Sequence, residues 1–204
     1  MGELAEALRR GDGLVAEASF EGEDLAGATC DAAEFSQVTL TGCSVAGGRF
    51  DRASFTDVVL RDCDLSNASL RNSYWRRCEL IGCRLVGVDL WQSFFAASRA
   101  TDSNLSFANL AGSKLERMRL KGCNLAEASL SGLRFKGGIT LERCDLTRAE
   151  LYQTRLAGVD LSGCEIAGIR LSDAKSELRG AKIAPEQAID LVGLLGVRIL
   201  GLDD

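Results

Sequence analysis

Large apolar side chains recur at every fifth position along most of this chain. Counting in fives from Phe20, every position up to Phe135 is apolar. The segment KGGIT that follows adds one residue, and the spacing then resumes at Leu141. A further shift of two residues comes after Leu171. Neither an amphipathic helix nor a long alternating strand has a period of five, so the pattern indicates an internal repeat.

The position two residues before each large apolar residue is usually small, as at Ala53 and Ala108. Residues two apart on an extended strand point to the same face, so each five-residue unit sends one large and one small side chain inward. Glycine and asparagine are frequent two residues after the large position, as at Gly42 and Asn67. Both residues tolerate left-handed backbone. The sequence therefore predicts short extended sides separated by corners.

Several units follow the pattern A-(D/N)-L-x-x, including Ala108-Asn109-Leu110, Cys63-Asp64-Leu65 and Cys144-Asp145-Leu146. These units resemble the pentapeptide-repeat family, and the resemblance covers about residues 15–183. It implies an all-β fold, a right-handed quadrilateral β-helix with four units per coil. At roughly 4.8 Å between coils, about eight coils would form a rod about 40 Å long.

The cysteines provide an internal test of the four-sided fold. Six of them are spaced 20, 20, 40, 21 and 20 residues apart, and Ser103 fills the gap. The six are Cys43, Cys63, Cys83, Cys123, Cys144 and Cys164. All take the small inward position, which predicts a ladder of buried thiols in a narrow core. A metal or redox site at Cys78 and Cys83 is the alternative, but the chain has no C-x-x-C pair and no histidine, so we expect no cofactor.

One inward column is predicted to be a stack of aromatic rings. Its members are Phe35, Phe55, Trp75, Phe95, Leu115 and Phe135. In the next column, Ala100 leaves one level underfilled, which suggests either a distorted coil with a functional loop or compensated packing. Whether the insert at residues 136–140 forms a functional loop is also left open by the sequence.

The two ends differ from the repeats. Residues 1–14 are expected to form an N-terminal cap with a short helix from Glu3, residues 15–183 the β-helix, and residues 184–204 a helix and a short strand at 197–200. Apolar residues surround the second helix, which begins at Pro185, whereas covering the last coil needs only one face. This distribution predicts a homodimer, with a helix fully tucked into the cap as the alternative. The predicted interface residues are Ile189, Leu191, Val192, Leu194 and Leu195.

The tail, ELRGAKIAPEQAIDLVGLLGVRIL, resembles the closing segment of the quinolone-resistance subgroup of the family, the Qnr and MfpA type. That subgroup binds DNA gyrase and topoisomerase IV by resembling duplex DNA, and protects them from poisons. The resemblance implies a DNA-mimicking protein that serves antibiotic resistance or self-immunity. A generic scaffold for protein–protein interactions with another partner is the alternative.

The distribution of charge along the chain agrees only in part with that expected of a DNA mimic. Residues 1–64 hold 13 acidic and 5 basic side chains, whereas residues 65–155 hold 8 acidic and 14 basic ones. Acids are therefore concentrated in the N-terminal part instead of along one whole side. The candidate partner-binding acids are Asp24, Asp31, Asp51, Asp57, Asp62 and Asp64. A second candidate site is an outward apolar cluster of Tyr74, Trp91 and Phe94 beside Arg76 and Arg77.

Other classes of function are disfavoured by composition. The chain has no histidine, no visible pair of nucleophile and base, and no phosphate-binding loop, so we expect no enzyme. A basic side could bind nucleic acid, but it has few exposed aromatic residues, and we expect no direct nucleic-acid partner. No apolar run approaches the roughly 18 residues of a membrane span, and the N-terminus does not resemble a signal peptide. The expected location is the cytoplasm, without membrane contact.

Overall fold

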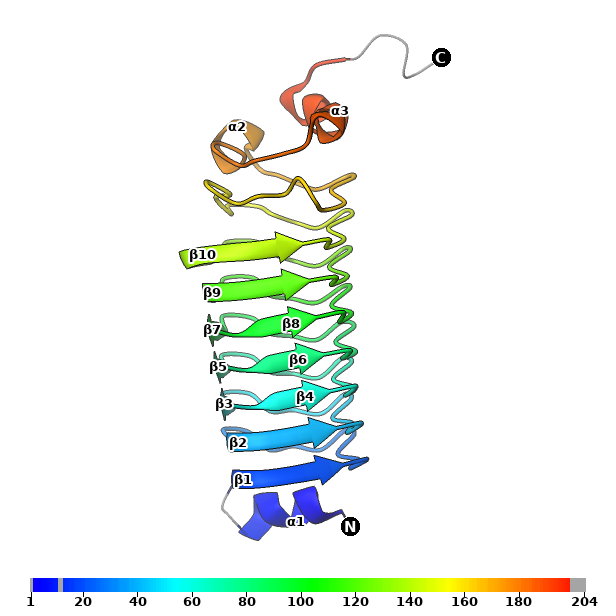
Figure 1. Cartoon of the computed structure of the whole chain (residues 1–204), viewed down its shortest axis with the longest axis vertical. Coiled ribbons are helices and arrows are strands. Elements are labelled where there is room, and N and C mark those ends of the chain that lie inside the picture. The colour runs from blue at the N-terminus through cyan, green and yellow to red at the C-terminus, as the bar shows by residue number, and fades with distance from the viewer. Residues whose placement is uncertain (1, 11–12, 199–204) are drawn as a thin grey trace.

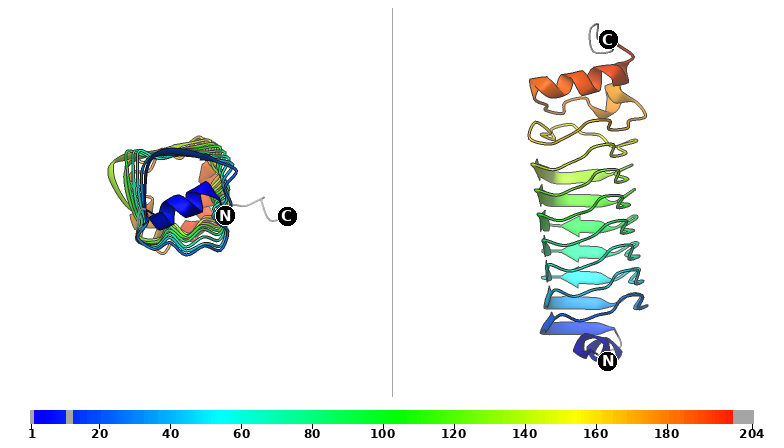
Figure 2. Two further views of the ribbon diagram at one scale, coloured as in Figure 1. Left: turned by 90° about the horizontal axis from the view of Figure 1, so that it is seen from below. Right: turned by 90° about the vertical axis from the view of Figure 1, so that its right-hand side faces the viewer.

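The chain winds into a long parallel β-solenoid with four sides (Figure 1, Figure 2). The computed structural model describes residues 2–10 and 13–198. Strand partners lie 20 residues apart, as in the pairs Phe35–Phe55 and Leu60–Leu80. The strands cover about six turns, and single bridges continue the winding as far as the pair Asp160–Lys182. The predicted β-helix is therefore confirmed, together with its four units per coil.

We number the four sides in chain order from β1. Side 1 carries β3 (Ser54–Thr56), β5 (Tyr74–Arg76) and β7 (Phe94–Ala96). Side 2 carries β4 (Val59–Arg61), β6 (Glu79–Ile81) and β8 (Arg99–Thr101). Four longer strands run along both, namely β1 (Leu14–Glu21), β2 (Glu34–Thr41), β9 (Lys114–Lys121) and β10 (Arg134–Glu142). Sides 3 and 4 are joined by isolated parallel bridges, such as Asp24–Ser44 on side 3 and Thr29–Arg49 on side 4.

The predicted aromatic column forms the core of side 1. Phe35 stacks on Phe55 with ring centroids 5.0 Å apart, and Phe55 stacks on Trp75 at 3.9 Å. Trp75 stacks in turn on Phe95 at 5.7 Å. On side 2, Ala100 is buried and pairs in regular register with Leu80 and Leu120. The distorted coil considered for Ala100 is therefore wrong, since its strand is as regular as its neighbours.

The six cysteines of the predicted ladder are all buried. The Cys63 thiol donates to the carbonyl oxygens of Leu40 and Arg61, at 3.4 and 3.3 Å, so the thiols take part in the hydrogen bonding of the coils. On side 2, burial raises the pKa of Cys78 to about 11, so this thiol is uncharged near neutral pH. Among residues 2–10 and 13–198, no group of three or more possible ligands could hold a metal ion.

Corners form where the backbone becomes left-handed. The predicted positions Gly42 and Asn67 have φ of +59° and +54°. The inserted residue lies at such a corner, because Gly137 and Gly138 together face Arg117 on the neighbouring coil. The insert is thus a β-bulge inside β10, and the pairing resumes at Ile139. No separate loop forms between residues 136 and 140.

The first coil is covered by α1 (Glu3–Arg10), which lies across the open end of the solenoid (Figure 2). Leu4 and Leu8 of this helix are buried against the core. The Glu23 carboxylate accepts hydrogen bonds from the backbone N–H groups of Glu3 and Leu4, at 3.0 and 3.4 Å. A side chain from the first coil therefore caps the helix, which satisfies two donors that a helix start leaves unpaired.

The opposite end is closed by α2 (Ala174–Glu177) and by a helical segment of η1 (Pro185–Gln187), α3 (Ala188–Val192) and η2 (Gly193–Leu195) (Figure 1). The sequence did not predict α2, which occupies the second shift of phase. Gln187 is buried, and its amide nitrogen donates to the carbonyl oxygens of Leu161 and Cys164, at 2.8 and 2.6 Å. The strand expected at 197–200 is not formed at Val197 and Arg198, and residues 199 and 200 lie outside the described part. None of the described helices is long and apolar enough to cross a membrane.

Glu177 replaces hydrogen-bond acceptors that a further coil would have supplied. On an earlier coil the Gly132 N–H donates to the Tyr152 carbonyl oxygen, at 2.8 Å. At the equivalent place the Gln153 N–H donates to the Glu177 carboxylate instead, and the backbone N–H groups of Ser172 and Asp173 donate to it as well. Burial of Glu177 acts to raise its pKa, but the hydrogen bond from the Ser172 hydroxyl, together with these backbone N–H groups, outweighs burial and lowers it.

This arrangement predicts acid sensitivity of the C-terminal cap. A lowered pKa in the folded state stabilises the fold at pH values above the ordinary glutamate pKa of about 4.3, and this contribution is lost as the pH falls below it. Glu177→Gln should cost about 1.5–3 kcal/mol of unfolding free energy at pH 7, and the difference from the unmodified protein should shrink toward pH 3. Thermal unfolding followed by circular dichroism across this range measures both effects. Glu186→Gln, an exposed residue of the same cap, should change neither.

Candidate interaction surfaces

The predicted acidic residues do not form one stripe. Each side presents three outward positions per coil, so residues separated by multiples of 20 share a column. Asp24 and Asp64 share a column on side 3, while Asp31 and Asp51 share one on side 4. The remaining two lie apart from both columns, at positive-φ corners after β3 and β4. These two are Asp57 and Asp62.

Local partners also occupy most of these carboxylates. Asp31 pairs with Arg49 at 3.1 Å. Asp57 pairs with Arg77 through two short hydrogen bonds, which hold the pKa of the Asp57 carboxyl below its usual range. Asp64 accepts from the Ser66 backbone N–H at 2.8 Å. Much of the charge of these six residues is therefore balanced or directed to the protein's own backbone, and the six carboxylates do not lie in one column.

The aromatic patch, defined as Tyr74, Trp91 and Phe94, is brought together in part. Tyr74 and Phe94 stack on side 1, with ring centroids 5.3 Å apart and planes inclined by 22°. Trp91 lies on side 4, three residues before Phe94, across the corner at Gln92. The exposed fractions of Tyr74 and Trp91 are 38% and 40%, and Phe94 is half-buried. The aromatic patch therefore wraps around one edge of the rod and is accessible to a partner.

Phe107 is a further exposed aromatic residue that the sequence analysis missed. It stands at the corner between sides 3 and 4, with a φ of +59° and 59% of its surface exposed. Equivalent corners on neighbouring coils hold Asn67 and Gly87, which suit left-handed backbone. A bulky residue is unfavourable at such a φ. The signal was present in the sequence, since residue 107 interrupts a column of small and polar corner residues.

We expect Phe107→Asn to preserve or increase stability. Asparagine adopts left-handed backbone at lower cost, and the exposed ring loses little burial. The free energy of unfolding should stay the same or rise by up to about 1 kcal/mol, as measured by urea denaturation. The nearby inward residue Leu110 is buried, so Leu110→Asn provides a contrast that should be strongly destabilising. A clear loss of stability in Phe107→Asn would show that the Phe107 ring packs as part of the fold.

The predicted dimer residues differ in where they lie. Leu191 is buried in the protomer's own cap, with 7% of its surface exposed. Val192 is half-buried. Ile189 and Leu195 are exposed by 53% and 59%, and Leu194 is also exposed. The helix is therefore not fully tucked into the cap, since one face covers the last coil and the other leaves an apolar surface uncovered. Whether a second copy covers that surface stays a prediction.

Comparisons with known proteins agree with this architecture. A model described as the pentapeptide repeat region matches residues 15–90, and one described as pentapeptide repeats (8 copies) matches residues 103–139 and 140–175. No curated protein matches the chain significantly. A solved structure of trypsin-treated QnrB1, a plasmid-mediated fluoroquinolone resistance protein, is 25% identical, with a TM-score of 0.51, over 91% of this chain and 99% of that one.

A second solved structure also matches most of this chain. HetL, involved in heterocyst differentiation regulation in the cyanobacterium Nostoc sp. strain PCC 7120, is 21% identical, with a TM-score of 0.36, over 90% of this chain and 96% of that one. The five-residue period, the four sides and the two family matches all describe the same architecture. This chain belongs to the pentapeptide-repeat family.

Proposed function

We propose that this chain is a non-enzymatic interaction protein that binds a type II topoisomerase, DNA gyrase or topoisomerase IV, and protects it from quinolone-like or other poisons. The similarity to QnrB1 supports this most directly, because it extends over nearly the whole length of both proteins. The resemblance of the tail to the quinolone-resistance subgroup supports it independently of the repeats. The biological role would be antibiotic resistance or self-immunity.

In this proposal the topoisomerase contacts the aromatic patch. The arrangement of the two candidate sites supports this choice. DNA mimicry through charge requires acids along the surface that meets the enzyme. The six candidate acids are divided among sides 3 and 4 and two corners, and two of them, Asp31 and Asp57, are paired with arginines. Tyr74 and Trp91 offer large exposed surfaces of the residue types that dominate interface energies. The rod shape would then serve to fit a duplex-sized channel.

The experiment that tests this proposal is a direct binding measurement. Immobilised protein is exposed to purified gyrase and to topoisomerase IV, each at low and at moderate ionic strength. We expect binding to at least one enzyme that changes little with salt, because apolar contacts are not screened. Binding that weakens steeply with salt and requires Asp24 and Asp64 would instead favour electrostatic mimicry.

A homodimer through the C-terminal helical segment is part of the proposal. The exposed apolar residues of this segment support it, since they remain uncovered in one protomer. Ile189→Asp combined with Leu195→Asp should shift the protein from dimer to monomer in light scattering without unfolding it. Leu191→Asp should instead unfold the cap, because Leu191 is buried. A monomer in the unmodified protein at high micromolar concentration would contradict the proposal.

A scaffold that binds a different protein is the second candidate. It is favoured by the spread of the acids, which departs from the charge expected of a DNA mimic. The same aromatic patch would serve this partner. Binding to neither topoisomerase, with the aromatic patch still needed for retention of some other cellular protein, would select this candidate.

A further inference from the structure

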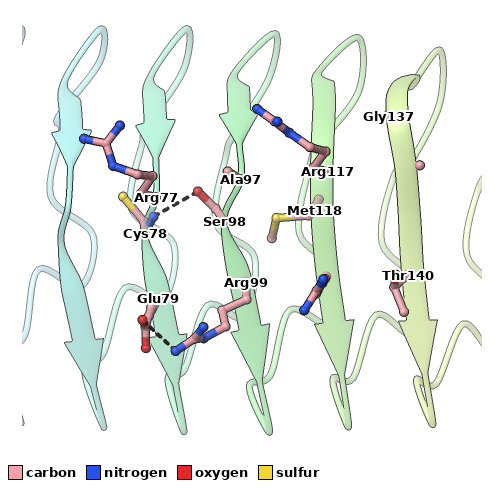
Figure 3. Close-up of a pocket in the computed structure, with 12 residues that line it drawn as sticks. Arg77, Cys78, Glu79, Ala97, Ser98, Arg99, Arg117, Met118, Gly137 and Thr140 are labelled. Carbon is pink, nitrogen blue, oxygen red and sulfur yellow. Dashed lines mark hydrogen bonds and ion pairs between the residues drawn. The ribbon is translucent and has the colours of Figure 1, made fainter.

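A groove follows the corner between sides 1 and 2, from the coil of β5 to the coil of β10 (Figure 3). Its volume is about 600 Å³. The column of corner residues along it alternates large and small, as Arg77, Ala97, Arg117 and Gly137. A Cβ atom on Gly137 would lie 2.8 Å from Cγ of Arg117. The missing side chain at Gly137 leaves room for the Arg117 side chain, and the small Ala97 leaves the corner on the other side of Arg117 open.

The residues that line this groove carry a net positive charge, although three of its four arginines are paired with carboxylates. Four arginines line it and one carboxylate lies among them. The four are Arg77, Arg99, Arg117 and Arg119, and the carboxylate is Glu79. Lys136, which directly precedes Gly137 in the chain, pairs with Glu116 at 3.8 Å. Within the part of the chain that the structure describes, Arg119 makes no ion pair with a carboxylate.

The existing ion pairs are exchangeable. Arg99 pairs with Glu79 at 2.6 Å (Figure 3). Arg117 pairs with Glu116 at 3.2 Å. The side chains of Arg99 and Arg117 are exposed by 57% and 64%. Pairs this exposed contribute little to stability, because solvent screens them. Their guanidinium groups are nevertheless held over the groove, so a partner's carboxylates could replace or share the internal ones at small cost.

The stacking of the aromatic residues near the groove argues against a nucleic acid as its occupant. Single strands bind basic grooves by stacking their bases on exposed aromatic faces. On side 1 the faces of Tyr74 and Phe94 stack on each other, so the facing surfaces of both rings are already used. Glu79 and Glu116 lie among the arginines, so the positive charges of the groove are spaced and not continuous. A nucleic acid carries a charge on every nucleotide, whereas a polypeptide can space its acidic side chains to match the unpaired positive charges.

We propose that this groove binds an acidic polypeptide segment in an extended conformation, with its carboxylates on Arg99, Arg117 and Arg119. The distance from Arg77 to Gly137 is three coils, roughly 14 Å at about 4.8 Å per coil. An extended chain at about 3.3 Å per residue covers this length with four or five residues. The site is separate from the aromatic patch, and it does not depend on the topoisomerase proposal.

The test is fluorescence anisotropy with a labelled peptide of about eight residues, mostly Glu and Asp, titrated with the full-length protein at low salt. We expect saturable binding that weakens as salt is added. Arg117→Glu combined with Arg119→Glu should weaken it about tenfold or more. The matched control is Arg148→Glu combined with Arg170→Glu, which makes the same charge change on sides 3 and 4. It should alter the affinity less than about twofold.

Three results would overturn the proposal. The first is an absence of peptide binding at low salt, and the second is an equal loss in the control variant, which would indicate attraction by net charge alone. The third is tighter binding of a thymidine oligonucleotide of the same charge, which would assign the groove to nucleic acid. Should the double Glu variant fail to fold by circular dichroism, Arg117→Gln combined with Arg119→Gln removes the same contacts without reversing charge.

Discussion

Replacing Trp75 with alanine should lower the free energy of unfolding by about 3–5 kcal/mol. Trp75 is fully buried, and its ring lies between Phe55 and Phe95 in the aromatic column of side 1. Its indole N–H also donates to the Ser73 hydroxyl at 2.8 Å. Truncation therefore removes stacking on both faces, leaves a cavity and takes one hydrogen-bond partner from a buried hydroxyl. Because each coil contacts only its neighbours, the defect should also weaken coupling between the two halves of the rod.

Urea denaturation followed by circular dichroism measures this effect. We expect a lower midpoint and a broader or biphasic transition, as two partly independent halves unfold. The matched control is Trp91→Ala, which removes the chain's other tryptophan from an exposed position. It should change stability by no more than about 0.5 kcal/mol. A loss below about 1 kcal/mol in Trp75→Ala would contradict the packing described for side 1.

The second large effect concerns the aromatic patch. We expect Tyr74→Ala combined with Trp91→Ala to weaken binding of the topoisomerase by about 2–4 kcal/mol, which is roughly 30-fold to 1,000-fold. Both side chains are exposed in the free protein, so the loss should come mainly from the contact, with the Tyr74–Phe94 stacking as the part of the fold that also changes. The effect should be nearly the same at low and moderate salt, since no charge is changed.

Charge reversal of the acids provides the matching comparison. Asp24→Lys combined with Asp64→Lys alters one column of side 3 and leaves the aromatic patch intact. We expect this variant to bind within about threefold of the unmodified protein. Surface plasmon resonance at two ionic strengths separates the two mechanisms. A large, salt-dependent loss in the lysine variant, with little change in the alanine variant, would assign the contact to the acids.

The solenoid itself could be predicted from the sequence because its constraints are local and repeated. A large inward residue such as Leu65 must recur every five positions, since each side of a coil is five residues long. Corner residues such as Gly42 are recognisable by their tolerance of left-handed backbone. The cysteine spacing indicates the number of sides, because each step of 20 residues returns to the same column.

Packing between columns could not be predicted in the same way. Ala100 suggested a distorted coil, but the parallel register of β8 with its neighbours is set by backbone hydrogen bonds and is unaffected by one small side chain. The apolar pattern of the C-terminal helix groups Leu191 with exposed residues, whereas in the structure Leu191 is buried in the core. Both outcomes depend on contacts between segments that are far apart in the sequence. The five-residue period does not specify those contacts.

The residue numbers of the candidate acids are enough to assign each acid to a column of the solenoid. Asp24 and Asp64 differ by two full coils and share a column, whereas Asp57 and Asp62 fall at corners of other columns. The acids were grouped because they lie close together in the sequence. In the solenoid, however, they lie on different sides and corners and do not form one surface. The pairing of Asp57 with Arg77 also follows from a separation of 20 residues. Outward residues of a solenoid are best compared column by column.

The most direct test of the central claim is an assay of poisoned DNA cleavage. Purified gyrase or topoisomerase IV is incubated with plasmid and a quinolone, with and without an excess of this protein. The account predicts that the protein reduces cleaved DNA and restores supercoiling, and that the Tyr74→Ala, Trp91→Ala variant does so much less. No change in supercoiling or in cleavage, with folded and dimeric protein in excess over the enzyme, would contradict it.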